Sequence, residues 1–348
     1  MRRRADQAHP TAVPPTQGGS PVSAVRRTPQ THRAQRSRRT HLRTALTVAT
    51  VTGLCALSLT ATAQADDDRR GERGGSSAKA AGEALFDDFD YTSHTDPAIS
   101  ANGWTVRGES GGPGVPGAGW SPENITFSQD GDNSVMNLET STAGTPESTE
   151  QSELLTQSMK FKNGTYASRV KFSDAPRSGP DGDRLVQTFF TLNDLTAPMA
   201  DDYSEYDFEY LPNGGWGEPA NILYTTSWET YRPDPWEAVN QHTESRTSFE
   251  GWHDLVFTID DNAITYYIDG EVFGTHDAQY LPERPMGIYF NQWLIDLEGQ
   301  TSTEPRAYDQ QVDYVLHVKD EVLSPAEVQA EVDSYRASGT SFEDNVPG

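Results

Sequence analysis

Short runs of alternating polar and apolar residues recur through most of the chain, and they limit its fold more than any other feature. They begin after about residue 83, they are rich in Thr, Tyr, Phe and Val, and turn-forming residues separate them. Alternation predicts strands with one buried face, and runs at this density are typical of a β-sandwich or barrel. Asp269-Gly270 after the last Ile of "AITYYI" is a strong hairpin signal. The runs are "SVMNLET", "GTYASRVKF", "LVQTFFTLN", "SEYDFEY", "ANILYTT", "HDLVFTI", "AITYYIDG", "MGIYFNQW" and "VDYVLHV".

One helix is expected, near the end of the chain. The segment at about 324–338, "SPAEVQAEVDSYRAS", opens with Ser324, Pro325 and Glu327. These residues form a capping box with proline at the first helical position. We assign no chemistry to this helix.

Residues 1–65 resemble a leader with a secretion signal. They hold ten Arg and one acid, and an apolar stretch from about 45 to 59 precedes a small-residue exit at Ala63-Gln64-Ala65. The stretch is short and rich in Thr, which favours a cleaved signal over a spanning helix. Arg38-Arg39 before it also permits a twin-arginine signal in place of the general Sec route. We therefore expect a secreted protein.

The rest of the chain divides into a linker and one large domain. Residues 66–82 are charged and small, as in a disordered linker, and 83–348 are long enough for a single β domain. Cys55, the only cysteine, lies inside the apolar stretch of the leader. The exported protein would therefore have no disulfide, no redox cysteine and no cysteine-bound metal.

The charge of the exported part argues against several partners. The whole chain carries −25, but ten of its 27 basic and one of its 52 acidic residues fall in the leader, so the remainder carries −34. Such a surface repels nucleic acid and, after signal cleavage, anionic membranes. Extracellular solubility is the simplest explanation of this charge, which permits a neutral or cationic substrate without demanding one. We expect a monomer.

The segment "DDYSEYDFEYLP" collects acids at every second position. On a strand, Tyr203, Glu205, Asp207 and Glu209 share one face, and a largely aromatic set shares the other. The aromatic face is able to pack in a sheet-on-sheet core, which leaves the acids on the opposite, solvent-reached side. Crowded carboxylates do not all ionise easily, so at least one pKa should be raised.

That arrangement suits glycoside cleavage. The Cα atoms of Glu205 and Glu209 are roughly 13 Å apart on a strand. Their side chains are long enough to approach the separation of about 5–5.5 Å that a retaining glycosidase needs. Our hypothesis makes Glu205 the nucleophile and Glu209 the acid/base, although the symmetry of a strand does not say which is which. The alternatives are an ordinary solvated strand face and a calcium site.

Six segments, in order, resemble glycoside hydrolase family 16. The acidic segment matches its E-x-D-x-E signature, with Tyr206 and Phe208 at the variable positions. The matching region extends over about 85–318. The other five segments are "LFDDFDY" (85–91), "KNGTYASRVKF" (162–172), "GWHDLVFTIDDNAITYYIDG" (251–270), "RPMGIYFNQW" (284–293) and "VDYVLHV" (312–318).

The resemblance implies a concanavalin-like β-jelly-roll sandwich of two curved antiparallel sheets, and a retaining double displacement on β-linked polysaccharide. Carried over by position, Glu205 matches the nucleophile, Asp207 the assisting carboxylate and Glu209 the acid/base. With no extra residue between Asp207 and Glu209, the strand matches the regular branch of lichenases and xyloglucan-active enzymes. Tyr203 stands where the lichenase pattern usually has Trp.

Other candidate residues are expected to bind the sugar. Asn291 and Trp293 match the N-x-W positions of the family, and Tyr224 and Trp228 follow the acidic strand. Tyr203 offers a flat ring for stacking, and Arg169 is expected to bond a carboxylate or a sugar, with a surface salt bridge as the alternative. Catalysis needs no cofactor, but the resemblance brings the option of a structural Ca²⁺, for which Gly131 and Asp313 are the positional matches.

The sequence thus predicts a secreted retaining endo-β-glycosidase, most readily of a β-glucan. A transglycosylase would use the same carboxylates and transfer the glycosyl group to a sugar. A non-catalytic carbohydrate-binding sandwich is the third reading, but it has no need of three aligned acids. The sequence does not identify the polysaccharide or the linkage.

Overall fold

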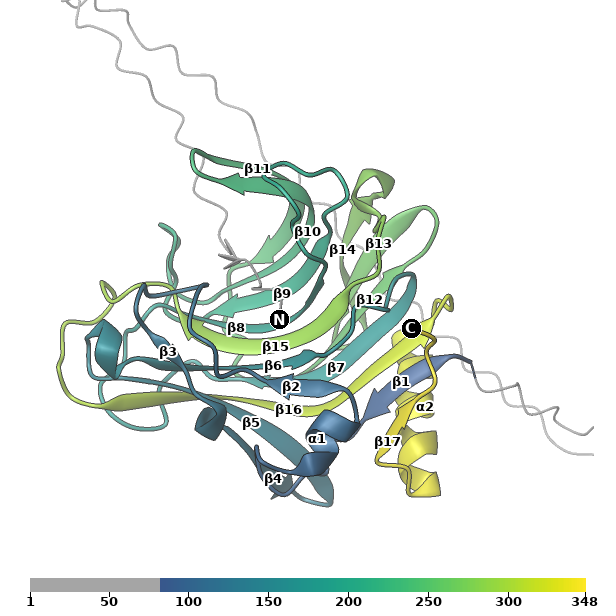
Figure 1. The fold of residues 1–348 in the computed structure, drawn as a ribbon, viewed down its shortest axis with the longest axis horizontal. Coiled ribbons are helices and arrows are strands. Elements are labelled where there is room, and N and C mark those ends of the chain that lie inside the picture. The colour runs from purple at the N-terminus through teal and green to yellow at the C-terminus, as the bar shows by residue number, and fades with distance from the viewer. Residues whose placement is uncertain (1–81) are drawn as a thin grey trace, which may run out of the picture. The chain divides into compact units, whose positions relative to one another are not determined.

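Two curved antiparallel sheets pack face to face in the computed structural model, which describes residues 82–348 (Figure 1). Both sheets curve in the same sense, so that one, the inner sheet, lies on the inside of the curve and the other, the outer sheet, on its outside. The expected leader (1–65) and all but the last residue of the expected linker (66–82) lie outside the described residues. The expected jelly-roll sandwich is confirmed.

The inner sheet carries the acidic strand near its middle. All its neighbouring strands are antiparallel. In spatial order it consists of β2 (Trp104–Val106), β6 (Glu150–Thr156), β15 (Gly287–Leu294), β8 (Leu185–Leu192), β9 (Glu205–Leu211), β10 (Ile222–Pro233) and β11 (Trp236–Ser245).

The outer sheet is organised around the long strand β16 (Arg306–Lys319). One edge of β16 pairs with β7 (Gly164–Phe172), which continues through β12 (Gly251–Ile259) and β13 (Ala263–Ile268) to β14 (Glu271–Asp277). Its other edge pairs first with β5 (Asn133–Thr142), which is followed by β4 (Ile125–Asp130), and then with β1 (Ala84–Asp87), which is followed by β17 (Phe342–Asp344). β3 (Gly119–Trp120) pairs in parallel with β6.

The space between the sheets is filled largely by aromatic rings. Phe189 stacks on Phe290 at 5.1 Å within the inner sheet, and Tyr166 stacks on Phe257 at 4.6 Å within the outer one. Phe208 of β9 meets Tyr266 of the outer sheet edge-on at 5.4 Å. Each fully buried ring of this size contributes about 1.5–3 kcal/mol through the hydrophobic effect.

This core fixes which way β9 faces. Tyr206, Phe208 and Tyr210 are buried in it. A slip of one residue along the neighbouring strands would exchange these rings for three carboxylates, which would be placed in an apolar core. The alternation of the sequence therefore determines the register, and the register determines where the acids point.

The helices are few and lie outside the sheets. α1 (Pro97–Ala101) was not expected from the sequence, whereas α2 (Pro325–Ser338) forms where it was expected, with the capping box of Ser324 and Glu327 in place. α2 covers the outer face of the outer sheet, where Tyr335 stacks on Phe86 at 4.4 Å. Short 3₁₀ turns occur at Pro122–Asn124, Pro146–Ser148 and Ala278–Tyr280. The helices of residues 82–348 are too short or too polar to cross a membrane.

The hairpin at Asp269-Gly270 also forms as expected. Both residues have positive φ, 53° and 85°, as a two-residue turn between antiparallel strands requires. It joins β13 to β14.

Candidate active site

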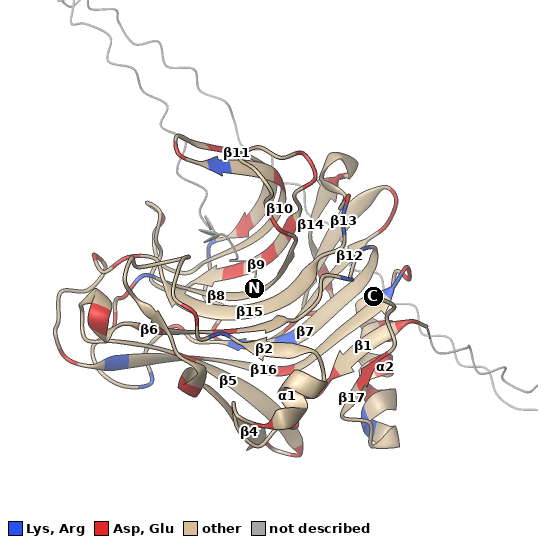
Figure 2. Cartoon of the chain, viewed as in Figure 1, with Lys and Arg blue, Asp and Glu red and all other residues tan. Residues whose placement is uncertain are grey.

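Glu205, Asp207 and Glu209 lie together on the face of the inner sheet that points away from the sandwich core. Their neighbours Tyr206 and Phe208 occupy the core, so alternation places the acids on the opposite side. In Figure 1 that side is the inside of the curve, and Figure 2 shows the acidic residues of β9 there. All three side chains are at most 4% exposed.

Two of these carboxylates are held by hydrogen-bond donors. The hydroxyl of Tyr203 donates to Oε2 of Glu205, and the indole Nε1 of Trp228 donates to Oδ2 of Asp207 at 2.8 Å. Burial and the flanking glutamates raise the pKa of Asp207 well above its usual range, so Asp207 keeps its proton and donates it to Glu205. Glu205 thus receives two donated hydrogen bonds, which favour its charged form.

Glu209 lacks this support. Its Oε1 is buried without a hydrogen-bond partner. Burial, with a smaller contribution from the charge of Glu205, raises the pKa of Glu209 to about 8. Burial also raises the pKa of Glu205 to about 7, but hydrogen bonds from Tyr203 and Asp207 oppose that rise. The environment therefore separates one carboxylate that ionises first from one that retains its proton.

Residues of the neighbouring strands extend the surface on both sides of β9. Asp207 lies opposite Phe190 of β8 and Thr226 of β10, and Phe190 lies opposite Tyr289 of β15. The rings of Phe190 and Tyr289 stack at 5.0 Å. This aromatic pair was not identified from the sequence, although the alternation of "LVQTFFTLN" already placed Phe190 on the face opposite to Phe189.

A polar row crosses the sheet at the level of Glu209. Thr188 lies opposite Glu209 and donates to Oδ1 of Asn291 at 2.7 Å, and Nδ2 of Asn291 donates to Oε2 of Glu153 at 3.0 Å. Glu153 is paired with Arg107 at 3.1 Å. Sequence reasoning placed Asn291 here but missed Glu153 and Arg107. The segment "EQSELLT" does not alternate, so it gave no signal for Glu153.

The expected aromatic residues reach this side of the sheet, but most are buried. Tyr224 lies opposite Glu209, Trp228 lies opposite Glu205, and Trp293 packs with Tyr224 in one cluster. Tyr203 is 2% exposed and meets Tyr231 edge-on at 5.3 Å. The expectation that Tyr203 offers an open ring for stacking is therefore wrong, because its hydroxyl is committed to Glu205 and its ring to Tyr231.

Arg169 is not brought to this site. It belongs to β7 in the outer sheet, where its side chain shares a face with Ala167, which packs against α2. Its Nη1 bonds Oδ2 of Asp313 at 3.1 Å, and its guanidinium lies 4.7 Å from the centre of the Trp252 ring. The assignment of Arg169 to substrate binding is corrected here, and the salt bridge is what the structure contains.

One of the two expected calcium ligands, Asp313, has other partners. Asp313 is 1% exposed, and its Oδ1 accepts from Nη2 of Arg336 at 2.8 Å while its Oδ2 accepts from Arg169. Gly131 lies in the turn between β4 and β5. Two guanidinium groups on one carboxylate oppose a divalent cation, and no cluster of three metal-binding side chains occurs within residues 82–348. The residues present do not fit a calcium ion.

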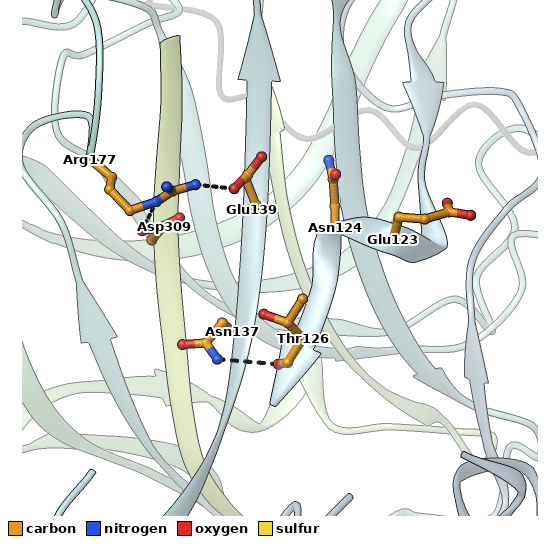
Figure 3. A pocket seen from close by; sticks show the side chains of 7 residues that line it. All are labelled: Glu123, Asn124, Thr126, Asn137, Glu139, Arg177 and Asp309. Carbon is orange, nitrogen blue, oxygen red and sulfur yellow. Dashed lines mark hydrogen bonds and ion pairs between the residues drawn. The ribbon is translucent and has the colours of Figure 1, made fainter. Parts of the chain in front are cut away.

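A pocket of about 280 Å³ occurs elsewhere, on the outer face of the outer sheet (Figure 3). Its lining includes Glu139 of β5 and Asp309 of β16, both paired with Arg177. Arg177 offsets only one of these two negative charges, and the carboxylates of β9 face the opposite way. The pocket therefore plays no part in the candidate active site.

Comparison with known proteins supports the fold. No family model and no curated protein matches the chain. Among solved structures, a Bacillus licheniformis β-glucanase is 18% identical, with a TM-score of 0.50 over 69% of this chain and 100% of its own. A Bacteroides ovatus GH16 protein in complex with its G4G4G3G product is 17% identical, with a TM-score of 0.48 over 66% and 98%.

A κ-carrageenase from Pseudoalteromonas carrageenovora, in complex with an oligotetrasaccharide of κ-carrageenan, is 16% identical, with a TM-score of 0.47 over 70% and 98%. The match to the β-glucanase covers the whole of that solved chain. Residues 82–348 therefore share the sandwich fold of the Bacillus licheniformis β-glucanase.

Proposed function

We propose that the chain is a retaining endo-β-glycosidase that hydrolyses a β-linked polysaccharide, with a β-glucan as the first substrate to test. The observation that carries this proposal is the unequal support of two glutamates on one strand. Glu205 receives hydrogen bonds from Tyr203 and Asp207, whereas Glu209 Oε1 has no partner. Retaining glycosidases need such a pair, one charged and one protonated at the same pH.

The roles follow from this asymmetry. Glu205 attacks the anomeric carbon while Glu209 gives its proton to the departing glycosidic oxygen, so that a glycosyl ester forms and the bond to the leaving sugar breaks. Glu209, now a carboxylate, takes a proton from water, and the resulting hydroxide equivalent displaces Glu205 from the anomeric carbon. Both glutamates end the cycle in their starting states.

Asp207 acts through its neighbour. Its proton is donated to Glu205, and its Oδ2 accepts a hydrogen bond from the indole of Trp228. This bond holds the nucleophile in place and spreads its charge in the resting enzyme. When Glu205 forms the ester it loses its charge, and the hydrogen bond from Asp207 weakens. When the ester is hydrolysed, Glu205 leaves as a carboxylate and the hydrogen bond regains its strength.

The experiment is a panel of neutral β-glucans, β-mannan, xyloglucan and sulfated galactans, assayed by release of reducing ends. We expect the wild type to cleave at least one neutral polymer, and Glu205→Gln to lower its kcat by at least about 10³-fold. Glu250→Gln, an exposed residue, is the control and should match the wild type. Equal activity of Glu205→Gln and wild type would remove the proposal.

Product length separates hydrolysis from transfer. Hydrolysis gives only fragments shorter than the substrate, which mass spectrometry of the digest resolves. Products longer than an oligosaccharide substrate would instead identify a transglycosylase that uses the same carboxylates.

Export through the leader is part of the proposal. The basic region, the apolar stretch and Ala63-Gln64-Ala65 support it. The secreted protein should be a monomer that starts near residue 66, as intact mass and light scattering of culture-medium protein would measure. Retention of residues 1–65 in that protein would contradict cleavage.

A further inference from the structure

Two half-buried tryptophans lie beyond opposite ends of the carboxylate row. Trp236 starts β11 and packs on the ring of Tyr231 at 6.1 Å, with an angle of 27° between the rings. Trp216 lies in the loop after β9 and contacts Trp293 at 6.1 Å. Each half-buried indole therefore contacts a buried aromatic residue of the candidate site.

The wall that ends in Trp236 is connected to the carboxylates by direct contacts. Trp236 meets Trp228 edge-on at 6.3 Å, and the indole of Trp228 holds Asp207. Tyr231, under Trp236, meets the ring of Tyr203, which holds Glu205. The position of Trp236 is therefore fixed relative to two of the three acids.

A β-bulge creates this wall. The register of β10 against β11 shifts between Trp228 and Thr230, so one extra residue is inserted at Glu229. Without it, Trp228 and Tyr231, three residues apart, would point to opposite sides of the sheet. The bulge turns both rings to the side of the carboxylates.

The line of the carboxylates sets the path of a bound polysaccharide. Glu205 and Glu209 follow one another along β9 and must flank the scissile bond from two sides. A chain held between them therefore crosses the strands and does not run along β9. The two sides of the bound polysaccharide then face the two ends of the carboxylate row, where Trp236 and Trp216 lie.

Charge favours a neutral chain at these walls. On this side of the inner sheet Arg107 is paired with Glu153, and Arg246 with Glu218 and Glu244. These arginines have their charge satisfied, and the ionised Glu205 adds negative charge. A sulfated or carboxylated sugar would be repelled.

We propose that Trp236 and Trp216 form two aromatic walls that stack on sugar units of a neutral β-linked polysaccharide as it crosses β9. This inference rests on the proposed function and deepens it. Apolar C–H faces of sugars lie against indole rings, and tryptophan supplies a large contact area at low entropic cost. The two walls bind the polymer and take no part in bond cleavage.

The test compares Trp236→Ala and Trp216→Ala with Trp252→Ala, each as the full exported chain. Trp252 is the matched control because it is also half-buried but lies on the outer face of the other sheet. On the polymer that the wild type cleaves, each wall variant should raise KM about five- to tenfold, with kcat within about twofold. Trp252→Ala should keep the KM of the wild type.

Trp236→Phe guards against a folding defect, because it keeps a ring at the hairpin and should retain a KM within about threefold of the wild type. Binding of an oligosaccharide to Glu205→Gln, measured by calorimetry with and without each wall substitution, gives a readout that needs no turnover. The wild type cleaves the polymer if the proposed function is right. If both wall variants then keep the KM and the binding of the wild type, the proposal that Trp236 and Trp216 bind sugar is overturned and the proposed function stands. If the wild type neither cleaves nor binds any of the polymers, the proposed function itself is overturned.

Discussion

The hydroxyl of Tyr203 donates a hydrogen bond to Oε2 of Glu205, two residues further along the same side of the chain. Glu209, four residues beyond Glu205 on that face, has no comparable donor at Oε1. A strand repeats every two residues and treats these two glutamates alike. The difference between nucleophile and acid therefore comes from their neighbours, and Tyr203 is the first of them.

Loss of that donor should shift the pH profile. The hydrogen bond from Tyr203 lowers the pKa of Glu205 against the larger opposing effect of burial. Tyr203→Phe removes the bond and keeps the ring, so the pKa of Glu205 should rise above about 7. The acidic limb of kcat/KM, which reports ionisation of the nucleophile, should move to higher pH by about 0.5–1 unit.

The measurement is kcat/KM on the preferred polymer from pH 5 to 9 for both proteins. Tyr335→Phe, whose ring stacks on Phe86 away from the carboxylates, is the control and should leave the limb in place. An acidic limb that does not move in Tyr203→Phe would mean that the hydroxyl does not tune the nucleophile.

The buried acid should cost stability at high pH. In the folded protein the pKa of Glu209 is about 8, above the 4.5 of an unperturbed glutamate. The folded state thus holds a proton that the unfolded chain releases, so stability falls as pH rises from about 4.5 to about 8. Glu209→Gln removes this penalty and should raise Tm by about 3 °C or more at pH 8.5, but by less at pH 5.

Thermal unfolding followed by circular dichroism at the two pH values checks this. A Tm of Glu209→Gln that lies below that of the wild type at pH 8.5 would show that Glu209 stabilises the fold in its ionised form, against the expectation.

The fold should be indifferent to calcium. Arg336 of α2 bonds both Asp88 and Asp313, which places a guanidinium where the family resemblance suggested a metal. We expect EDTA and CaCl₂ each to change the Tm of the wild type by less than about 1 °C. Arg336→Met should lower the free energy of unfolding by roughly 1–3 kcal/mol, because Asp313 stays buried with one partner fewer.

Arg177→Met is the matched control, since Arg177 also bridges two acids on the outer sheet but is 55% exposed. Its cost should stay below about 1 kcal/mol. A rise of several degrees in the Tm of the wild type with calcium would show that a metal binds in spite of Arg336.

The pair of Arg306 and Asp183 should be sensitive to a change of cation. Both side chains are 0% exposed, and Nη2 of Arg306 bonds Oδ1 of Asp183 at 2.6 Å beside a second bond through Nε. Lysine lacks this two-pronged geometry, so Arg306→Lys should lower the free energy of unfolding, measured in urea, by about 3–5 kcal/mol.

Arg184→Lys is the control, because Arg184 forms a half-exposed pair with Asp296. It should lower the free energy of unfolding by less than about 1 kcal/mol. Equal losses in the two variants would contradict the argument.

The strands could be predicted because each carries its own two-residue pattern. The run at 164–172 appears as β7 with the expected bounds, and the run at 185–193 appears as β8, which ends one residue earlier. The acids of β9 occupy the face that alternation gave them. The pattern within a strand depends only on local residues, since one side must be apolar for the sandwich to close. The capping box of α2 was predictable for the same reason.

The position of Arg169 could not be predicted in this way. Alternation tells which side chains of β7 share a face, but it does not tell which sheet the strand joins or which face packs against α2. That information lies in pairing between residues far apart in the chain, such as Arg169 opposite Tyr314 and Asp254. Arg336, more than 20 residues after Asp313, is a partner of the same kind.

The aromatic contacts of the site were only partly predictable. Trp228 and Tyr224 were expected beside the acids, and both lie opposite glutamates of β9. The bulge at Glu229, which turns Tyr231 to the same side, left no recognisable mark in the sequence. The role of Tyr203 as a hydrogen-bond donor to Glu205 could not be predicted from the sequence, because it depends on a contact that only the structure shows.

Rescue with azide tests the division of roles between the two glutamates most directly. In Glu205→Ala, azide fills the space of the nucleophile and attacks from its side, so an aryl β-glycoside of the released sugar should give the α-glycosyl azide. In Glu209→Ala, azide attacks the glycosyl ester on Glu205, so the β-glycosyl azide should form. The account predicts these two products by proton NMR; the β-azide from Glu205→Ala, or the α-azide from Glu209→Ala, would contradict it.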